Sequence, residues 1–231
     1  MSSAKLAFIT EADLKVQPDD LTDFSPEERD RLVVSYERIG EDWVPLSFYG
    51  EDEWQLAGGP TNRAKSHRKL NFRRFPESFR ATAKVMTWRY MRRGREGGKI
   101  PDVSTLISWV KDARSFLFWL AKRGIAHLSD ASPMACLQYV EAEKARTSKR
   151  GKPLSPKTLN LEFIAVEAIH ELSQFTSDPM PAHPWPDSSA KYLAQNLSDC
   201  LSTSKTPLFP DVIFCMLFQC AWEMIQKGGW W

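Results

Sequence analysis

The sequence predicts a mainly α-helical fold, and three features support this prediction. Apolar residues recur at helical spacing through most of the chain beyond residue 78. Serine–proline pairs or acidic residues precede several of these stretches, and glycines follow them. The 231 residues are 42% hydrophobic and 12% aromatic, which is typical of a folded protein with a core rather than a disordered chain.

Residues 1–60 form an acidic N-terminal region, with fourteen Asp and Glu against five Lys and Arg. The run Ser25-Pro-Glu-Glu28 is a capping box with proline in the first turn, and it predicts a short helix to about Arg38. The stretch from Trp43 to Trp54 is interpreted as short strands or loop. A Gly-Gly-Pro run at 58–60 predicts a break.

Residues 61–100 form a basic arm and helix, with thirteen Lys and Arg against two Glu. The first half, NRAKSHRKLNFRRF, has no helical stripe and is predicted to be an arm or loop. Ser78 to Arg93 is predicted to be a helix that ends at Gly94. One side of this helix carries Phe79, Ala83, Met86 and Tyr90. The total charge of +2 hides this asymmetry, and a polyanion would meet the basic block.

The region 101–186 begins with a helix predicted from Val103 to Arg123. Asp102 or Ser104 is its candidate N-cap, and Gly124 ends it. Its apolar stripe predicts one buried face, made of Leu106, Trp109, Val110, Ala113, Phe116, Leu117 and Leu120. The opposite face carries Lys111, Arg114, Lys122 and the aromatic Phe118.

Two further helices are predicted after a Ser-Pro start. One runs from Ser132 to Arg146, and the other opens at Ser155-Pro156 and runs to about Gln174. The connector at 147–154 is polar and basic. The helix from Ser155 to about Gln174 has an expected buried seam of Leu161, Ala165, Ala168 and Leu172, with Ile164 and Ile169 beside them.

Three segments carry a family resemblance: TLISWVKDARSFLFWLAKRGI, LSDASPMACLQYVE and KPLSPKTLNLEFIAVEAIHELSQFT. In this order they resemble the N-terminal core-binding domain of tyrosine recombinases, the phage-integrase family. The resemblance implies a SAM-like helical bundle over 101–186 that forms one jaw of a clamp around double-stranded DNA. It also implies other recombinase protomers as partners, and no cofactor or small-molecule ligand. Glu162 departs from the pattern, because a basic or neutral residue is expected near the phosphates.

Residues 187–231 are expected to be a C-terminal helical stub leading to an absent catalytic domain. A proline-rich linker over 178–186 precedes them, with Trp185 packed on the domain as a lock, and Asp187 can cap a helix to about Leu201. The last helix, Pro210 to Lys227, is apolar on nearly all faces and therefore needs burial.

The sequence does not contain the catalytic motifs that the resemblance calls for. Tyrosine recombinases hold the scissile phosphate with two arginines, one usually in a His-x-x-Arg pair, and attack it with a tyrosine. None of the four histidines is followed by arginine three positions on, and Tyr192 is the only tyrosine after the core-binding segments. We therefore expect no catalytic residue and no enzyme activity of the chain on its own. Cys–His catalysis stays open, since such partners meet only in space.

Metal binding and membrane insertion are not expected. Cys136, Cys200, Cys215 and Cys220 form no C-x-x-C pair, and no histidine lies at zinc-ligand spacing from two of them. Free thiols in a reducing compartment are the simpler interpretation. The N-terminus lacks the apolar core of a secretion signal, and no apolar run reaches the roughly 18–20 residues of a membrane span. The expected location is the cytoplasm.

Three sets of residues are candidates for contact with the DNA backbone, which is bound by Lys, Arg, small polar side chains and helix N-termini. The arm set is Arg63, Lys65, Arg68, Lys69, Arg73 and Arg74. The helix set is Lys111, Arg114 and Lys122. The turn set, which combines a basic turn with a helix N-terminus, is Lys149, Arg150, Lys152, Ser155, Lys157, Thr158 and Asn160.

The expected function is DNA binding within site-specific recombination or integration of a mobile element. For the arm and helix sets, the competing interpretation is an ordinary solvated surface. A regulatory DNA-binding remnant is one alternative function for the whole chain. A helical protein–protein interaction module, with the basic block on an acidic partner and the apolar last helix on a subunit, is the other.

Overall fold

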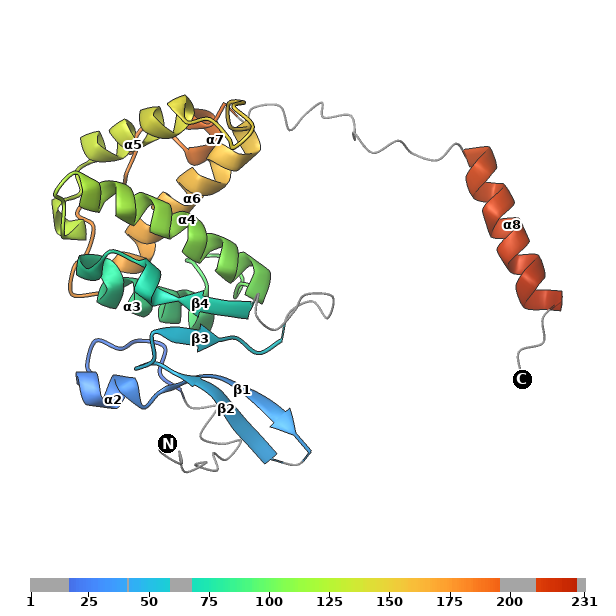
Figure 1. The fold of residues 1–231 in the computed structure, drawn as a ribbon, viewed down its shortest axis with the longest axis horizontal. Helices are drawn as coiled ribbons and strands as arrows, with labels where there is room; N and C mark the ends of the chain where they lie inside the picture. Colours follow the sequence, from blue (N-terminus) through green and yellow to red (C-terminus); the bar gives the residue numbers. More distant parts are fainter. Residues whose placement is uncertain (1–16, 41, 59–67, 196–210, 228–231) are drawn as a thin grey trace. The chain divides into compact units, whose positions relative to one another are not determined.

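The computed structural model describes residues 17–40, 42–58, 68–195 and 211–227. The chain divides into two compact units, Met1–Asn196 and Leu197–Trp231, and each is described by itself. The first unit combines helices with two small two-stranded sheets (Figure 1). The second contains helix α8, Asp211–Lys227. The mainly α fold class is therefore confirmed.

The acidic region folds as a short helix followed by a hairpin. The capping box of Ser25 is present, but α2 spans only Pro26–Asp30. The predicted continuation to Arg38 is wrong, because the chain turns into strand β1, Val33–Ile39, which pairs antiparallel with β2, Asp42–Phe48. β-branched Val33 and Val34 are buried in this strand, and Gly40 takes the positive φ of 67° that a tight turn requires.

The second sheet joins the acidic and basic regions. Strand β3, Glu53–Gln55, pairs antiparallel with β4, Lys69–Asn71, which runs into the 3-10 helix η2, Phe72–Arg74. The prediction of an arm or loop is wrong for this described part of 61–75. Leu70, Phe72 and Phe75 are buried, so the segment is held by its apolar side chains and by strand pairing.

Helix α3, Glu77–Arg93, matches its prediction, and Phe79, Ala83, Met86 and Tyr90 are all buried as expected. Trp88 is buried as well, and its Nε1 donates a hydrogen bond of 2.8 Å to the carbonyl of Pro18. Arg92 donates through Nη2 to the carbonyl of Val33 at 2.8 Å. These bonds fasten the N-terminal region to the helical part.

Helix α4, Val103–Lys122, lies at the centre of the first unit, between α3 and α5 (Figure 1). Asp102 rather than Ser104 caps it, accepting from the amide of Thr105 at 2.6 Å. All seven residues of its predicted stripe are buried. Helices α5, Pro133–Ala145, and α6, Pro156–Ser173, begin at the predicted caps Ser132 and Ser155.

The buried face of α6 differs from the predicted seam at one position. Ala165, Ala168 and Leu172 are buried, but Leu161 is 51% exposed and the neighbouring Glu162 only 6% exposed. The seam prediction at Leu161 is therefore wrong. Glu162 can be buried because Arg146, at the C-cap of α5, pairs with it.

The segment after α6 packs onto the helices. Met180 and Trp185 are buried, and Trp185 Nε1 donates to Glu167 Oε1 at 2.6 Å. Helix α7 spans only Ala190–Leu193 and is capped by Ser189, so the prediction of Asp187 as its cap is wrong. Leu201, the predicted end, lies outside the described residues. One hydrophobic core runs through the first unit, from Leu21 to Ala194.

Taken by itself, α8 exposes its apolar side chains around the whole helix. The exposed residues include Val212, Ile213, Phe214, Met216, Leu217, Phe218, Trp222, Met224 and Ile225. Within the described ranges, no helix has the length and apolar character needed to cross a membrane.

Candidate nucleic-acid interface

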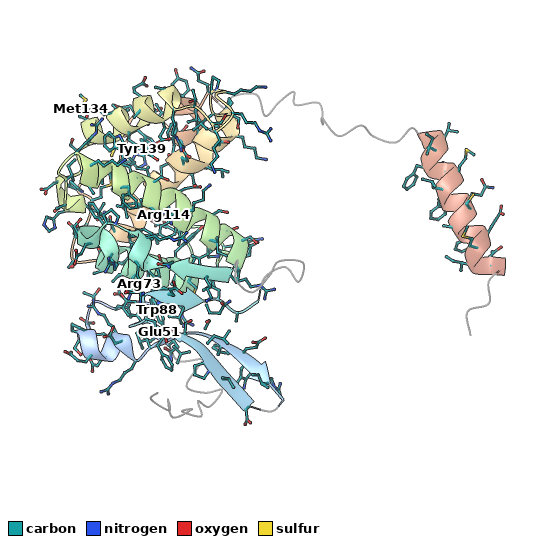
Figure 2. All side chains as sticks on the ribbon, viewed as in Figure 1. Glu51, Arg73, Trp88, Arg114, Met134 and Tyr139 are labelled. Atoms are coloured by element: carbon teal, nitrogen blue, oxygen red, sulfur yellow. The ribbon has the colours of Figure 1, made fainter. Side chains whose placement is uncertain are left out.

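A cleft of about 620 Å³ opens on the surface formed by η2, α4 and α5. We call it the basic cleft. Its lining residues are Arg74, Arg114, Ser115, Phe118, Trp119, Lys122, Glu143 and Arg146. Arg74 comes from η2, Arg114 and Lys122 from α4, and Arg146 from the end of α5. Figure 2 shows Arg114 midway along α4, with Tyr139 between α4 and α5.

Three of the four cations in the basic cleft are uncompensated. Arg74, Arg114 and Lys122 form no ion pair within the part of the chain that the structure describes. Partial burial, and after it the charge of Arg74, lowers the pKa of Arg114 from its ordinary value. Two guanidinium groups that repel each other and form no ion pair with a carboxylate among the described residues make a favourable place for a phosphate.

Aromatic side chains lie among these cations. Phe118 is 42% exposed, although most large apolar residues of α4 are buried. Trp119 is half-buried, and the guanidinium carbon of Arg123 lies 4.0 Å from its ring centroid. The cleft therefore offers an apolar surface for sugar or base beside positive charge for phosphate.

The fourth cation, Arg146, binds two carboxylates. Its Nε lies 2.5 Å from Glu143 Oε2, and its Nη2 donates to Glu162 Oε1 at 2.5 Å. Burial, and after it the charge of Glu162, raises the pKa of Glu143 to about 7. Burial likewise raises the pKa of Asp112 from its ordinary value. Arg146 is thus held at the edge of the cleft by Glu143 and Glu162, and the charge of Glu143 changes near neutral pH.

The arm set is divided by the fold. Arg63 and Lys65 lie outside the described residues. Arg68 precedes β4 and Lys69 begins it. Arg73 is exposed, with its Nε 3.4 Å from Asp52 Oδ2. Of the described members of the arm set, only Arg74 lines the basic cleft.

The helix set is largely brought together. Arg114 and Lys122 both line the basic cleft, whereas Lys111 does not. Lys111 is exposed, and its Nζ lies 3.8 Å from Asp112 Oδ1. It therefore provides a natural comparison with Arg114 on the same helix.

The turn set forms a separate exposed feature. The amide of Gly151, which has a φ of 72°, donates to the carbonyl of Ser148 at 2.8 Å and closes the basic turn. Lys149, Arg150, Lys152 and Lys157 are exposed. None of the seven residues of the turn set lines the basic cleft.

The N-terminus of α6 has fewer groups for a phosphate than expected. Ser155 Oγ accepts from the amide of Thr158 at 3.2 Å and lies 2.9 Å from the Thr158 hydroxyl. Pro156 has no amide hydrogen. Asn160 is half-buried, with its Oδ1 withdrawn from solvent.

Arg146 is the cation of the basic cleft that the arm, helix and turn sets omit. Arg146 ends the helix predicted from Ser132 and directly precedes the basic connector, so the sequence shows a positive charge at this position. Its pairing with Glu143, three residues earlier, is a local pattern, whereas its pairing with Glu162, sixteen residues away, could not be predicted from the sequence. Only the packing of α4, α5 and α6 places Arg146 beside Arg114.

A second cavity, of about 1000 Å³, lies between α3, α6 and the segment after α6. The rings of His170 and His183 are 5.5 Å apart there, and burial lowers the pKa of His170. Arg95 pairs with Glu171 at 2.7 Å, so charge in this cavity is largely compensated. Among the described residues, no group of three His, Cys, Asp or Glu side chains is arranged to hold a metal ion.

Comparison with known proteins identifies no relative of this chain. No protein family, curated protein or solved structure matches this chain.

Proposed function

We propose that this chain binds the backbone of double-stranded DNA through the basic cleft, as the core-binding part of a tyrosine recombinase or integrase. The observation that carries the proposal is the meeting of Arg74, Arg114 and Lys122 around one cleft, with no carboxylate paired to them among the described residues. Phosphates are the ligands that such a group of cations prefers.

The position of the cleft agrees with the family resemblance. Two of its cations, Arg114 and Lys122, lie on α4, which carries the first resembling segment. In the proposed arrangement, this face of α4 follows the DNA backbone, and Phe118 packs against a sugar or base. The turn set would contact neighbouring phosphates from its own exposed position. Because phosphate contacts carry no direct base information, the proposal names no target sequence.

The test is fluorescence-anisotropy binding to a random DNA duplex at about 100 mM salt. Arg114→Glu and Lys122→Glu are each expected to weaken binding about tenfold, because each replaces a phosphate contact by repulsion. Lys111→Glu is the matched control, since it makes the same charge reversal on the same helix outside the cleft. Equal losses in all three variants would contradict a role for the cleft and favour general attraction by surface charge.

A protein–protein interaction module is the second candidate, and the apolar surface of α8 favours it. Phe214, Phe218 and Trp222 are exposed on α8 together with its other apolar residues. This function predicts stable oligomers and weak DNA binding. Sedimentation of the full chain with and without DNA separates the two candidates.

A further inference from the structure

A buried ionic cluster lies beside the basic cleft. We call it the carboxylate cluster: Asp112 from α4, Glu143 from α5 and Glu162 from α6, with Arg146 among them. The side chains of Glu143 and Glu162 are only 11% and 8% exposed. Glu143 and Arg146 also line the basic cleft, so the cluster and the cleft share two residues.

The cluster contains more acid than base. Among the described residues, the ion pairs of these three carboxyl groups are with Arg146, which pairs with Glu143 and Glu162, and with the exposed Lys111, whose Nζ lies 3.8 Å from Asp112 Oδ1. Like charges held together in a poorly solvated place cannot all ionise at little cost. A proton is therefore expected on one of the three carboxyl groups near neutral pH.

Buried polar atoms that have no hydrogen-bond partner among the described residues also favour the presence of a proton in this cluster. Tyr139 is fully buried on α5, and its hydroxyl has no hydrogen-bond partner among the described residues. The same is true of Glu162 Oε2. Burial raises the pKa of Tyr139, and the charges of Glu143, Glu162 and Asp112 add to this shift. A proton on Glu143 can be shared with Glu162, whose side chain is within hydrogen-bonding reach of Glu143.

We propose that DNA binding in the basic cleft is linked to protonation of Glu143, so that the cleft grips a phosphate when Glu143 is neutral and releases it when Glu143 is ionised. This inference rests on the proposed function of the cleft. Ionised Glu143 repels a phosphate directly and holds Arg146 by an ion pair. Neutral Glu143 removes that repulsion and frees the Nε of Arg146 for the phosphate.

The groups that face Glu143 support Glu143 as the site of protonation. Glu162 on α6 and Asp112 on α4 are acidic, and Tyr139 and Arg146 share its own side of α5. Glu162 accepts a hydrogen bond from Arg146 and does not line the basic cleft. Arg74, Arg114 and Lys122 line the same cleft as Glu143 and supply the positive charge that attracts the phosphate. Glu143 is thus the acid of the carboxylate cluster that also lines the basic cleft.

The test measures DNA affinity and proton uptake of the full chain between pH 6 and pH 8. With a pKa of about 7, roughly a tenth of Glu143 is protonated at pH 8, so affinity for a random duplex is expected to fall about tenfold from pH 6. Calorimetry at pH 7 in buffers of different ionisation enthalpy should show uptake of about half a proton on binding, because about half of Glu143 is already protonated at this pH.

Variants assign the effect to Glu143. Glu143→Gln is expected to bind at pH 8 about as tightly as at pH 6, without proton uptake. Glu141→Gln, an exposed change on the same helix, should keep the dependence of the unaltered chain. Glu162→Gln should move the midpoint to lower pH, because it removes a neighbouring charge that raises the pKa of Glu143. This variant also tests the proposal if Glu143→Gln does not fold.

The possible outcomes separate this inference from the proposed function. Binding that is independent of pH, or proton uptake that persists in Glu143→Gln, would overturn the inference while leaving DNA binding in place. The absence of DNA binding at both pH values would overturn the proposed function itself. A tenfold pH effect that disappears only in Glu143→Gln would support both.

Discussion

At the scale of single residues, the main finding is that charge in this chain is arranged by the fold and not by sequence runs. Arg73 and Arg74 are neighbours, yet Arg73 faces Asp52 and Arg74 lines the basic cleft. Lys111 and Arg114 lie one turn apart on α4, and only Arg114 reaches the cleft. Arg146 joins them because Glu162, which breaks the apolar seam of α6, is buried against it.

Protonation of Glu143 is also expected to affect stability. The pKa of Glu143 is raised from 4.5 to about 7 in the folded state, so the folded chain binds more protons than the unfolded chain between these values. The favourable contribution is fully present below pH 4.5 and is lost as pH rises through 7. Glu143→Gln should therefore gain stability relative to the unaltered chain as pH rises from 5 to 8, measured by urea unfolding.

The same comparison with Glu141→Gln provides the control. Its side chain is exposed and pairs with Lys144 at the surface, so its relative stability should change little over this range. A constant difference between Glu143→Gln and the unaltered chain at every pH would show that Glu143 has an ordinary pKa in the folded state.

At the scale of secondary-structure elements, local signals set the helices and tertiary contacts set the strands. Ser132 and Ser155 each accept a hydrogen bond from the amide three residues on, at 3.2 Å, and begin α5 and α6 as expected. Such caps are readable from sequence because their chemistry is local.

Removal of the α6 cap tests the contribution of this local signal. Ser155→Ala is expected to lower the free energy of unfolding by about 1 kcal/mol, because the amide of Thr158 loses its acceptor. Chemical denaturation followed by circular dichroism measures the loss. Ser104→Ala, in the first turn of α4 where Asp102 is the cap, is the control and should change stability by less than about 0.5 kcal/mol. An equal effect of both substitutions would contradict capping by Ser155.

The elements missed by sequence reasoning depend on partners far along the chain. Val33–Ile39 follows a capping box and was expected to stay helical, but pairing with β2 holds it extended. Residues 69–71 have no strand-length pattern of their own, and pairing with β3 makes them β4. In α6, Leu161 is exposed and Glu162 is buried, contrary to the prediction. The ion pair between Glu162 and Arg146 outweighs the preference for an apolar residue at a buried position. Local propensity does not contain these interactions.

At the scale of the whole molecule, the first unit behaves as one packed body despite its opposite charges. The acidic and basic regions share the β3–β4 sheet, and Trp88 binds Pro18 across them. Leu70 in β4 and Leu172 in α6 belong to the same hydrophobic core. The sequence showed the charge asymmetry, but not that one core extends from the acidic region to α7.

A shared core predicts shared unfolding. Leu70→Ala and Leu172→Ala are each expected to cost about 2–5 kcal/mol, since both side chains are buried. Each should lower the same single transition of the first unit, measured by tryptophan fluorescence and by far-UV circular dichroism in parallel. Two separate transitions, each sensitive to only one substitution, would show that the N-terminal region and the helices fold independently.

The central claim is that the basic cleft binds DNA phosphates, and a salt titration of the unaltered chain tests it most directly. Affinity for a random duplex would be measured by fluorescence anisotropy between about 50 and 200 mM salt. Three to four phosphate contacts predict a slope of log affinity against log salt of about −3 to −4. Monodisperse protein that does not bind at about 50 mM salt, or binds with a slope near zero, would contradict the account.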